Sequence, residues 1–452
     1  MESYWRKQTN SLPPDGNSEA AAPGAEKGND VPYDVIVVGA GMAGLLTAYY
    51  LKESGRRVLV LEAKTVASGQ TERTTAKITS QHGIKYSTLI QKAGKKRALL
   101  YAKANEEAIL SYEKLVKKEQ IDCQFARVPA FLYTRKEGTV LREEAKAAAS
   151  LGIDATFTTE TELPFPVEGA VRFGGQAQFS PLEFLRHIAA GFEIREHTMV
   201  RAVHGSQVLT DAGVFLAENV VAATHYPFRN VPGFYFLRQH QERSYVLALS
   251  GCDDIRGMYY GVDEDGISLR QAGDVLLFGG GGHRTGEAKQ CGAYEALLEK
   301  AKYYYPDCRE VARWSAQDCM PHDGIPLIGR YSVFTPHLYV ATGFQKWGMT
   351  SAMVAALLLR DELCGVENPY RKLFSPQRLC VRAGIRDFLT DVGMSVKGLV
   401  RGLFCRPRCP HMGCELEWNP QERSWDCPCH GSRFDEDGKL LDNPAKRDIE
   451  NW

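Results

Sequence analysis

The sequence predicts an α/β protein with three parts: a nucleotide-binding unit near the N-terminus, a strand-rich middle part, and a small all-β metal-binding domain at the C-terminus. A strand-like run at 33–38 is followed by a glycine loop, a helical segment at 45–53 and a second strand at 58–61, which is a βαβ unit. Strand-like runs dominate between this unit's long following helix and about residue 310. Five of the 12 cysteines lie after residue 404, with histidines among them.

Composition and charge narrow the function classes. The chain has 452 residues, 44% of them hydrophobic, which is enough for more than one domain and a large core. Lys and Arg total 55, as do Asp and Glu, so no overall positive charge attracts nucleic acid and we expect no such partner. The N-terminus lacks an apolar secretory segment, and the longest apolar stretch, 352–359, is too short to span a bilayer. We therefore expect a cytoplasmic protein that is not associated with a membrane.

Three segments outside the βαβ unit have recognisable patterns. Residues 1–31 are rich in Pro, Gly, Ala and Ser, which predicts a flexible leader. Hydrophobic residues recur at helical spacing in 91–118 and again in 379–403. We expect the second helix to pack on the protein's own surface, within a helical linker at 366–403. A helix on a membrane surface is the alternative, because its polar face is mildly basic.

The glycine loop has the spacing of a dinucleotide-binding site. Residues 39–44 read G-x-G-x-x-G, directly after a strand and at the start of a helix. The first glycine permits a tight turn, the second lets the backbone approach a pyrophosphate, and the third lets helix and strand pack closely. The helix N-terminus then faces the negative charge. Glu62, at the end of the second strand, is placed to bind an adenosine ribose, which suits FAD or NAD.

Four further stretches favour FAD. They are 67–77 (ASGQTERTTAK), 219–224 (NVVAAT), the PHDGIPLIG turn within 314–329, and 340–350 (VATGFQKWGMT). They resemble flavin-contacting segments of the D-amino-acid oxidase (DAO) superfamily, the last being its final FAD loop and helix start. The resemblance implies that the following residues bind FAD: Gly39, Gly41, Met42, Ala43, Gly44, Glu62, Ala63, Thr71, Thr74, Thr75, Gly343, Trp347, Gly348, Met349 and Thr350.

The resemblance to the DAO superfamily also implies a domain division. A Rossmann-like FAD-binding domain and an antiparallel-sheet substrate domain would share residues 32–365. The FAD-binding parts are expected at about 32–90, 165–235 and 310–365, and the substrate parts at about 91–164 and 236–309.

The C-terminal cysteines and histidines have the spacing of an iron–sulfur site. Cys409-x-His411 is followed by Cys427-x-x-His430, so that each of two loops supplies one thiolate and one imidazole. This is the ligand set of a [2Fe–2S] centre in which two cysteines hold one iron and two histidines hold the other. A zinc site is the alternative, although zinc-binding motifs usually begin with two closely spaced cysteines.

The residues around these ligands resemble those of Rieske proteins, as in Gly413-Cys414 and in CHGSRFD at 429–435. The resemblance implies a [2Fe–2S] cluster and, as in Rieske proteins of the cytochrome bc type, a disulfide between Cys414 and Cys429. Two free thiols are the alternative, which a reducing cytosol favours. The expected Rieske domain, 404–452, is smaller than usual. Rieske domains normally have several strands before the first cluster loop, whereas here the predicted helix leads almost directly into Cys409.

The complete arrangement resembles bacterial FAD-dependent oxidoreductases with a C-terminal Rieske domain. It implies that a small amine, amino acid or hydroxy acid is oxidised by hydride transfer to FAD, and that electrons leave singly through the cluster. An electron-acceptor protein, ferredoxin-like or similar, would be the partner. Two alternatives remain: a redox relay or sensor between protein partners, and an oxidase that uses O₂. A Rieske oxygenase is not expected, because no two histidines and a carboxylate have the spacing of a mononuclear iron site.

Three residues are candidates for the catalytic site. Lys346 lies in the final flavin loop, Arg243 could pair with a substrate carboxylate, and His283 follows a glycine run and could act as a base. For each of them, a surface ion pair or a buried structural role is the alternative.

Overall fold

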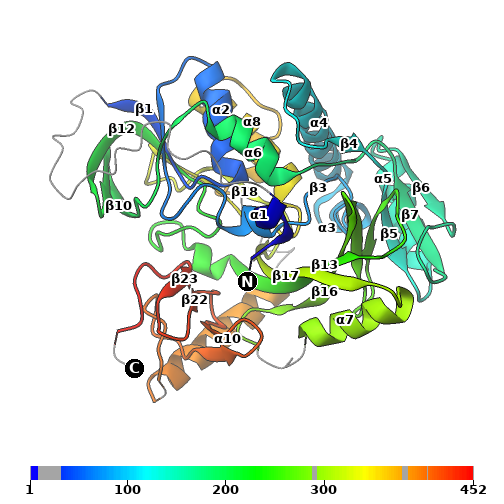
Figure 1. Cartoon of the computed structure of the whole chain (residues 1–452). Coiled ribbons are helices and arrows are strands. Elements are labelled where there is room, and N and C mark those ends of the chain that lie inside the picture. The colour runs from blue at the N-terminus through cyan, green and yellow to red at the C-terminus, as the bar shows by residue number, and fades with distance from the viewer. Residues whose placement is uncertain (1, 9–31, 288–292, 379–384, 405, 451–452) are drawn as a thin grey trace.

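The computed structural model describes residues 2–8, 32–287, 293–378, 385–404 and 406–450. Two eight-stranded sheets form the body of the protein, residues 32–378, and a four-stranded sheet belongs to the C-terminal module, residues 385–450. In Figure 1 the first large sheet lies at the upper left, the second at the right, and the C-terminal module below them. The expected α/β fold with a small all-β domain is confirmed.

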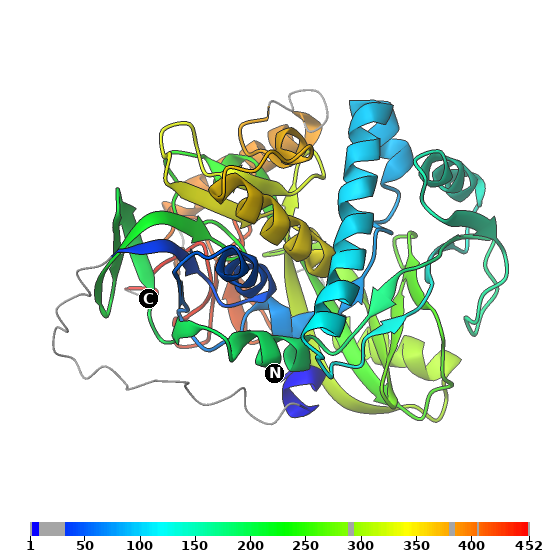
Figure 2. The ribbon, with the colours of Figure 1, turned by 90° about the horizontal axis from the view of Figure 1, so that it is seen from above.

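The first large sheet is built on parallel strands. Strand β1 (Tyr33–Val38) pairs in parallel with β2 (Val58–Leu61) and with β12 (Gly213–Ala222). Because both faces are covered, these strands are almost continuously apolar. Helices α2 (Met42–Glu53) and α8 (Gly348–Leu363) pack against each other beside this sheet (Figure 2). The remaining strands are β9 (Glu193–Arg195), β10 (Val200–His204), β11 (Gln207–Thr210), β18 (Leu327–Arg330) and β19 (Leu338–Thr342), and α6 (Pro181–Ala189) contacts α2.

The second large sheet is mostly antiparallel, and alternate side chains of its strands face opposite sides. Its strands, in spatial order, are β17 (Arg309–Pro321), β13 (Gln239–Ser250), β16 (Val275–Arg284), β15 (Ser268–Ala272), β14 (Met258–Gly261), β5 (Ala130–Thr134), β7 (Gly169–Phe173) and β6 (Ala155–Thr158). Helices α5 (Thr139–Ala149) and α7 (Ala293–Tyr304) contact strands of this sheet. α3 (Tyr86–Ala93) packs on α4 (Lys95–Lys118) and on α5, and α9 (Arg371–Phe374) contacts α4 and β18 of the first sheet.

Short elements connect the two large sheets. They are the three-stranded sheet of β3 (Lys77–Ile78), β8 (Ala177–Gln178) and β4 (Ala126–Arg127), and the 3₁₀ turns η1 (Gln70–Arg73) and η2 (Tyr235–Leu237). The helix expected at 91–118 is α4, which begins at residue 95 because Gly94, with φ +85°, separates it from α3.

The C-terminal module consists of one helix and four short strands. Helix α10 (Ile385–Gly402) corresponds to the expected amphipathic helix, whose first residues, 379–384, lie outside the described residues. The strands are β20 (Glu417–Asn419), β21 (Ser424–Asp426), β22 (Arg433–Phe434) and β23 (Leu440–Asp442). The part of the chain that the structure describes contains no helix with the length and apolar character needed to cross a membrane.

The N-terminus differs from the expected flexible leader. Residues Tyr4–Gln8 form a short helix, α1, and the side chains of Tyr4 and Trp5 are buried. The Trp5 indole donates a hydrogen bond to the carbonyl of Thr74 at 2.7 Å, and Arg6 pairs with Glu72. Trp5 and Arg6 therefore anchor the start of the chain to the stretch 67–77 that is predicted to contact the flavin, and the Tyr4 hydroxyl donates to the carbonyl of Ala272. The rest of the expected leader, 9–31, lies outside the described residues.

The sheet pairing also differs from the expected domain division. β7 lies within 165–235 and most of β17 lies within 310–365, both expected to be FAD-binding parts. β7 pairs with β5 and β6, and β17 pairs with β13, so both belong to the second large sheet. Sequence resemblance could not separate the two sheets here, because the chain crosses between them several times.

Candidate functional site

A cavity of about 1020 Å³ lies between the two large sheets and the C-terminal module. Its walls include the β1–α2 turn, residues 62–75, the glycine run Gly279–Gly282, the 343–349 loop and residues 440–448 of the C-terminal module. Typical small-molecule pockets measure about 300–1,000 Å³, so this cavity has room for a dinucleotide-sized cofactor.

The glycine loop has the tight geometry that its pattern predicts. Gly39 has φ +107°, and a Cβ there would lie 2.6 Å from the carbonyl oxygen of Ala223. A Cβ on Gly44 would lie 1.8 Å from the carbonyl oxygen of Gly39, so only glycine allows the helix to begin this close to the strand. The N-terminus of α2 consequently faces the cavity, where its backbone N–H groups favour a phosphate.

Glu62 lies on the cavity wall at the end of β2. One carboxylate oxygen accepts the backbone N–H of Ala40 at 2.8 Å, and the other accepts that of Lys64 at 2.9 Å. Burial raises the pKa of Glu62 although both hydrogen bonds lower it. Each oxygen has a further lone pair, so Glu62 can still accept a hydroxyl from a ribose.

A second helix N-terminus, that of α8, faces the same cavity. Trp347, the residue before α8, lines it and stacks on His82 with ring centroids 4.9 Å apart. Gly44 and Thr350, both predicted to contact FAD, do not line the cavity. Gly44 packs on Gly39, and the Thr350 hydroxyl exchanges hydrogen bonds with the backbone of Thr79. The predicted cofactor residues that line the cavity are Gly39, Gly41, Met42, Ala43, Glu62, Ala63, Thr71, Thr74, Thr75, Gly343, Trp347, Gly348 and Met349.

Lys346 lies on the cavity wall, as expected. Its Nζ is 3.3 Å from Oε2 of Glu242. Burial lowers the pKa of Lys346, but Tyr260, Glu242 and Asp318 raise it more, so the amine is held as an ammonium. A Cβ on Gly282 would lie 3.1 Å from this Nζ, so the glycine run keeps the space in front of Lys346 open.

Asp318 is a cavity residue that the sequence reasoning missed. Burial raises its pKa to about 7, with Lys346 lowering it and Glu242 raising it. Groups with such shifted pKa values are typical of sites that exchange protons near neutral pH. The sequence contains no motif around Asp318, because its importance depends on the register of β17 beside Lys346.

His283 does not line the cavity, contrary to the prediction that it acts as a base. Its Nε2 lies 3.1 Å from the Tyr245 hydroxyl, and its Nδ1 lies 2.8 Å from the carbonyl oxygen of Arg284. Both ring nitrogens are therefore engaged, and the imidazole packs on the Tyr245 ring. The glycine run before it lines the cavity, while His283 lies beyond its edge.

The prediction that Arg243 binds the substrate is also contradicted by the structure. Its side chain is 0% exposed and is directed away from the cavity toward the C-terminal module. The guanidinium donates hydrogen bonds to Ser315 at 2.8 Å and to Gln317 at 2.6 Å. It also lies 3.5 Å from Asp426 and 3.9 Å from Glu422 of the C-terminal module. Arg243 thus pairs with the module rather than with a substrate carboxylate.

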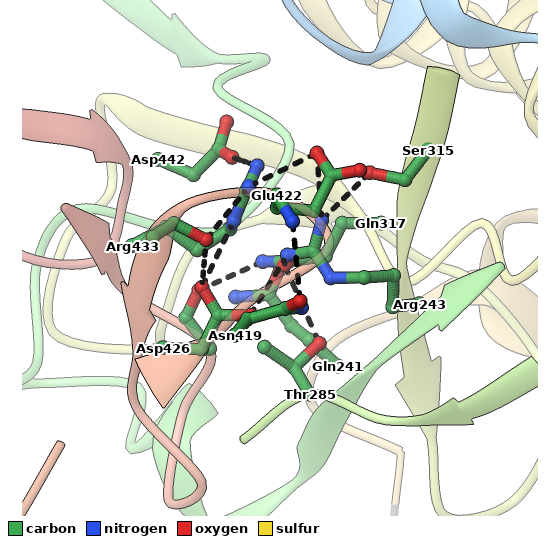
Figure 3. Close-up of polar contacts among 12 residues, drawn as sticks. Gln241, Arg243, Thr285, Ser315, Gln317, Asn419, Glu422, Asp426, Arg433 and Asp442 are labelled. Carbon is green, nitrogen blue, oxygen red and sulfur yellow. Dashed lines mark hydrogen bonds and ion pairs between the residues drawn. The ribbon is translucent and has the colours of Figure 1, made fainter. Parts of the chain in front are cut away.

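A buried ion network continues from Arg243 into the module (Figure 3). Arg433 donates to Asp442 at 2.8 Å and to Asp426 at 3.2 Å, and lies 3.3 Å from Glu422. Two arginines therefore share three carboxylates at the interface. Burial of each charge is costly, so the loss of one partner is expected to destabilise the contact by about 3–5 kcal/mol.

The four expected cluster ligands converge between two loops of the C-terminal module. Cys409, Cys427 and His430 are buried and His411 is half-buried, and the imidazole rings of His411 and His430 lie 5.0 Å apart. Among the described residues, Nδ1 of His411 and both ring nitrogens of His430 have no hydrogen-bond partner although they are buried. Buried imidazole nitrogens without partners next to two thiols fit a metal cluster.

The body of the protein contacts the first cluster loop through Asn230. Oδ1 of Asn230 lies 2.7 Å from Nε2 of His411. If Nε2 carries the proton, it donates to Asn230 and leaves Nδ1 available for iron, which is the arrangement expected for a ligating imidazole.

Cys414 and Cys429 are both free thiols in the structure. Their Sγ atoms and that of Cys427 all lie within 4.8 Å of one another. The disulfide between Cys414 and Cys429 stays a prediction. Helix α10 covers the pair, because a Cβ on Gly398 would lie 2.5 Å from Sγ of Cys429 and 3.7 Å from Sγ of Cys414.

The second cluster loop is hydrogen-bonded to the cavity wall. Gln241 on β13 donates to the carbonyl of His430 at 2.6 Å, and Gln317 on β17 donates to the carbonyl of Gly431 at 2.7 Å. Ala316 and Asp318, the neighbours of Gln317, line the cavity. One strand therefore has the cavity on one side and the cluster loop on the other.

Two histidines and a carboxylate do meet in space, although no sequence spacing indicated it. Ligand atoms of His240, His322 and Asp391 lie within 4.8 Å of one another. The Asp391 carboxylate also pairs with Arg284, and the acidic groups Asp391 and Glu242 raise the pKa of His240 to about 9 despite the opposing effect of burial. These three residues therefore belong to an ion-pair network that holds α10 on β13.

Comparison with known proteins agrees with this geometry. The family model described as FAD dependent oxidoreductase (DAO) matches residues 34–362, and that described as Rieske [2Fe-2S] domain matches residues 403–452. The chain belongs to the DAO family of FAD-dependent oxidoreductases. It binds FAD in its body and a [2Fe–2S] cluster in its C-terminal Rieske module, so the zinc alternative is set aside.

A relative with the same architecture is "Putative Rieske 2Fe-2S iron-sulfur protein YhfW" of Bacillus subtilis (strain 168). It is 33% identical over 498 residues, which cover 98% of this chain and 96% of that protein. The cytochrome b6-f complex iron-sulfur subunit 2 of Trichormus variabilis is 46% identical over 41 residues, 9% of this chain and 23% of that protein. That match is confined to a short segment.

Solved structures of DAO-family enzymes share the fold. Glycine oxidase from Geobacillus kaustophilus has a TM-score of 0.63 at 22% identity, over 77% of this chain and 99% of that chain. L-proline dehydrogenase from P. horikoshii has a TM-score of 0.64 at 18% identity, over 77% of this chain and 97% of that chain. At these identities the likeness establishes the fold and not the substrate.

Proposed function

We propose that the protein is a dehydrogenase of small amino acids, amines or hydroxy acids whose electrons leave singly through the Rieske cluster. When bound, FAD would supply two-electron (hydride) acceptance, and the [2Fe–2S] cluster would supply one-electron transfer. The residues of the chain bind the substrate, move its proton and keep the two cofactor sites together.

The polar groups of the cavity support a substrate that carries a carboxylate. The Lys346 ammonium can pair with a carboxylate, while the glycine run 279–282 leaves room beside it. Asp318, with its pKa raised to about 7, can accept the proton of a substrate amine or hydroxyl. Amino acids and hydroxy acids use both groups, so we favour them over simple amines.

The contact between β17 and the cluster loop is the observation that carries the electron route. Asp318 lines the cavity, and the adjacent Gln317 binds the carbonyl of Gly431 in the loop that supplies Cys427 and His430. Residues 440–448 of the Rieske module line the cavity as well. The two sites are thus neighbours across a single strand, which supports direct electron transfer between them.

The alternative of a relay without a metabolite substrate finds less support. A relay needs no large space for a substrate. Here the cavity has ionisable residues and open space beside Lys346. The enzyme hypothesis therefore agrees better with the cavity.

The potential of the cluster restricts the electron acceptor. Rieske centres have potentials of about −150 to +300 mV, whereas plant-type ferredoxins lie near −400 mV. Electron transfer from the cluster to such a ferredoxin is unfavourable in free energy. Of the acceptors expected from the sequence, ferredoxin-like or similar, a low-potential ferredoxin is therefore disfavoured. We propose a carrier of higher potential, such as a blue-copper protein or a c-type cytochrome.

An anaerobic substrate screen tests this function. Purified protein with both cofactors is mixed with matched amino acids, hydroxy acids and amines of equal side chain, and flavin bleaching and cluster reduction are recorded. We expect the carboxylate-bearing compounds to bleach the flavin. Lys346→Met should raise their half-saturation concentration about 10- to 100-fold, the value of a charge-assisted hydrogen bond. Lys114→Met, an exposed lysine on α4, is the control.

The opposite result would favour the relay. If no compound of the three classes bleaches the flavin, while a chemically reduced carrier protein does, the protein passes electrons between proteins and the dehydrogenase proposal fails.

A further inference from the structure

The outer face of α10 is apolar and basic. Val396, Val400, Leu403 and Phe404 are 55%, 52%, 66% and 84% exposed. Val396 and Val400 lie one turn apart on one side of the helix, and Leu403 and Phe404 follow directly after its end at Gly402. Four exposed cations lie close to them in the chain, namely Lys397, Arg401, Arg406 and Arg408.

This charge is local, because the whole chain has no net charge. Between residues 390 and 414 the sequence has one acidic residue, Asp391, and its side chain is buried against Arg284. Outside this stretch, Glu415 lies 3.8 Å from Arg401 and offsets part of its charge. The face therefore remains positive and attracts an acidic surface.

The inner face of α10 lies directly on the cluster loops. Gly398 packs on Cys429 and Cys414, as described above, and its carbonyl accepts the backbone N–H of Glu415 at 3.1 Å. A Cβ on Gly402 would lie 2.0 Å from the carbonyl oxygen of Gly413, two residues after His411. A partner on the outer face would therefore be separated from the cluster loops by one helix, about 10 Å thick.

We propose that the outer face of α10 and the turn after it dock an acidic, high-potential one-electron carrier protein that accepts electrons from the cluster. This proposal rests on the proposed function. Each docking event moves one electron: the reduced cluster is oxidised and the metal centre of the carrier is reduced. Two such events are needed for each substrate molecule, because a hydride carries two electrons.

A protein partner fits this face better than a membrane does. A helix that lies on a membrane needs a continuous apolar side, whereas Gly393 and Lys397 interrupt this one and the rest of α10 is used against the cluster loops. A small apolar centre with a charged rim is the pattern of transient electron-transfer interfaces, which bury less than about 1,200 Å².

Stopped-flow kinetics with two model carriers test the proposal. The reduced protein with both cofactors is mixed with an oxidised acidic blue-copper protein or with an oxidised basic c-type cytochrome, and cluster oxidation is followed. With the acidic carrier, the second-order rate constant should fall at least ~10-fold as ionic strength rises from about 0.01 M to about 0.3 M. The double variant Lys397→Glu/Arg401→Glu should lower it by a similar factor and should favour the basic carrier.

A matched variant separates this face from the overall charge. Lys103→Glu/Lys114→Glu makes the same charge change on exposed positions of α4 and should leave both rates within about twofold of the unmodified protein. Leu403→Ser/Phe404→Ser should weaken binding of the acidic carrier without changing the iron content. Equal rates for the α10 and α4 charge variants would overturn the proposal.

Two further measurements complete the test. Flotation with vesicles of phosphatidylglycerol and phosphatidylcholine should leave the protein unbound. Flotation that depends on Lys397 and Arg401 would replace the carrier with a membrane surface. Substrate-driven bleaching should be the same in all variants, so a failure to dock is distinguished from a failure of the proposed dehydrogenase function.

Discussion

At the scale of single residues, Asp318 and Lys346 both line the cavity. Glu242 lies beside both, holding Lys346 as a cation and contributing to the raised pKa of Asp318. A carboxyl group with a pKa near 7 and a permanently charged amine can divide two tasks between them: one accepts a proton and the other binds an anion. This division leads to a prediction for pH dependence.

The rate of flavin reduction by substrate should rise with pH and level off above an apparent pKa of about 7. Burial raises the pKa of Asp318 to about 7, so below this pH the carboxyl is protonated and cannot accept the substrate proton. Asp318→Asn should lower the rate about 10²- to 10⁴-fold and remove this pH dependence. Single-turnover absorbance measured from acid to alkaline pH tests this. An unchanged pH profile in the variant, with normal FAD content, would assign the proton to another group.

At the scale of elements, α10 is part of the Rieske module as well as a linker to it. Gly398 and Gly402 on one side of the helix let it approach the cysteines and the first cluster loop, where any side chain would collide with them. Asp391, on the same helix, joins it to His240 and Arg284 of the body. The module's strands are short, so this helix supplies much of the support for its loops.

Gly402→Ala should lower the cluster content of the purified protein and leave its FAD content unchanged. The added methyl would lie 2.0 Å from the carbonyl oxygen of Gly413 and would displace the first cluster loop, at a cost of about 1–3 kcal/mol. Gly393→Ala is the matched control, because nothing lies within 4 Å of a Cβ there. The control should be neutral or stabilising by up to about 1 kcal/mol. Iron, sulfide and flavin analysis would contradict the prediction if both variants held a full cluster.

At the scale of the whole molecule, the two cofactor sites are built as one structure. Residues 440–448 of the Rieske module line the cavity, and the ion network of Arg243 and Arg433 fixes the module on β13 and β17 (Figure 3). A buried network of this kind opposes separation of the two parts, because each exposed charge would lose its partners. The arrangement supports electron transfer without a large movement of the cluster.

His411→Ala should give protein that lacks the cluster but is still reduced by substrate. Hydride transfer requires FAD and the cavity residues, so one turnover of flavin bleaching should persist, whereas steady-state turnover with a one-electron carrier should fall at least ~100-fold. Iron analysis and stopped-flow absorbance on the same sample separate the two steps. Undiminished steady-state turnover would show that the flavin delivers electrons directly to the acceptor or to O₂.

The features that the sequence by itself determined are those encoded in short stretches of chain. The G-x-G-x-x-G loop with Glu62, the final flavin loop with Lys346, and the two cluster loops all depend on spacing within one turn, one hairpin or one βαβ unit. Backbone geometry over a few residues decides such motifs, so their patterns can be recognised without the fold. The cofactors, the α/β architecture and the family followed from them and were confirmed.

The tertiary structure decided which residues face one another across sheets and modules. Arg243 and His283 had the right chemistry for a substrate site, but the register of β13 and β16 placed one against the Rieske module and the other beyond the cavity edge. Asp318 and Gln317 show the same effect, because a shift of one position along β17 exchanges the cavity side for the cluster side. Side-chain direction in a strand alternates with every residue, and only the packed fold shows what lies on each side.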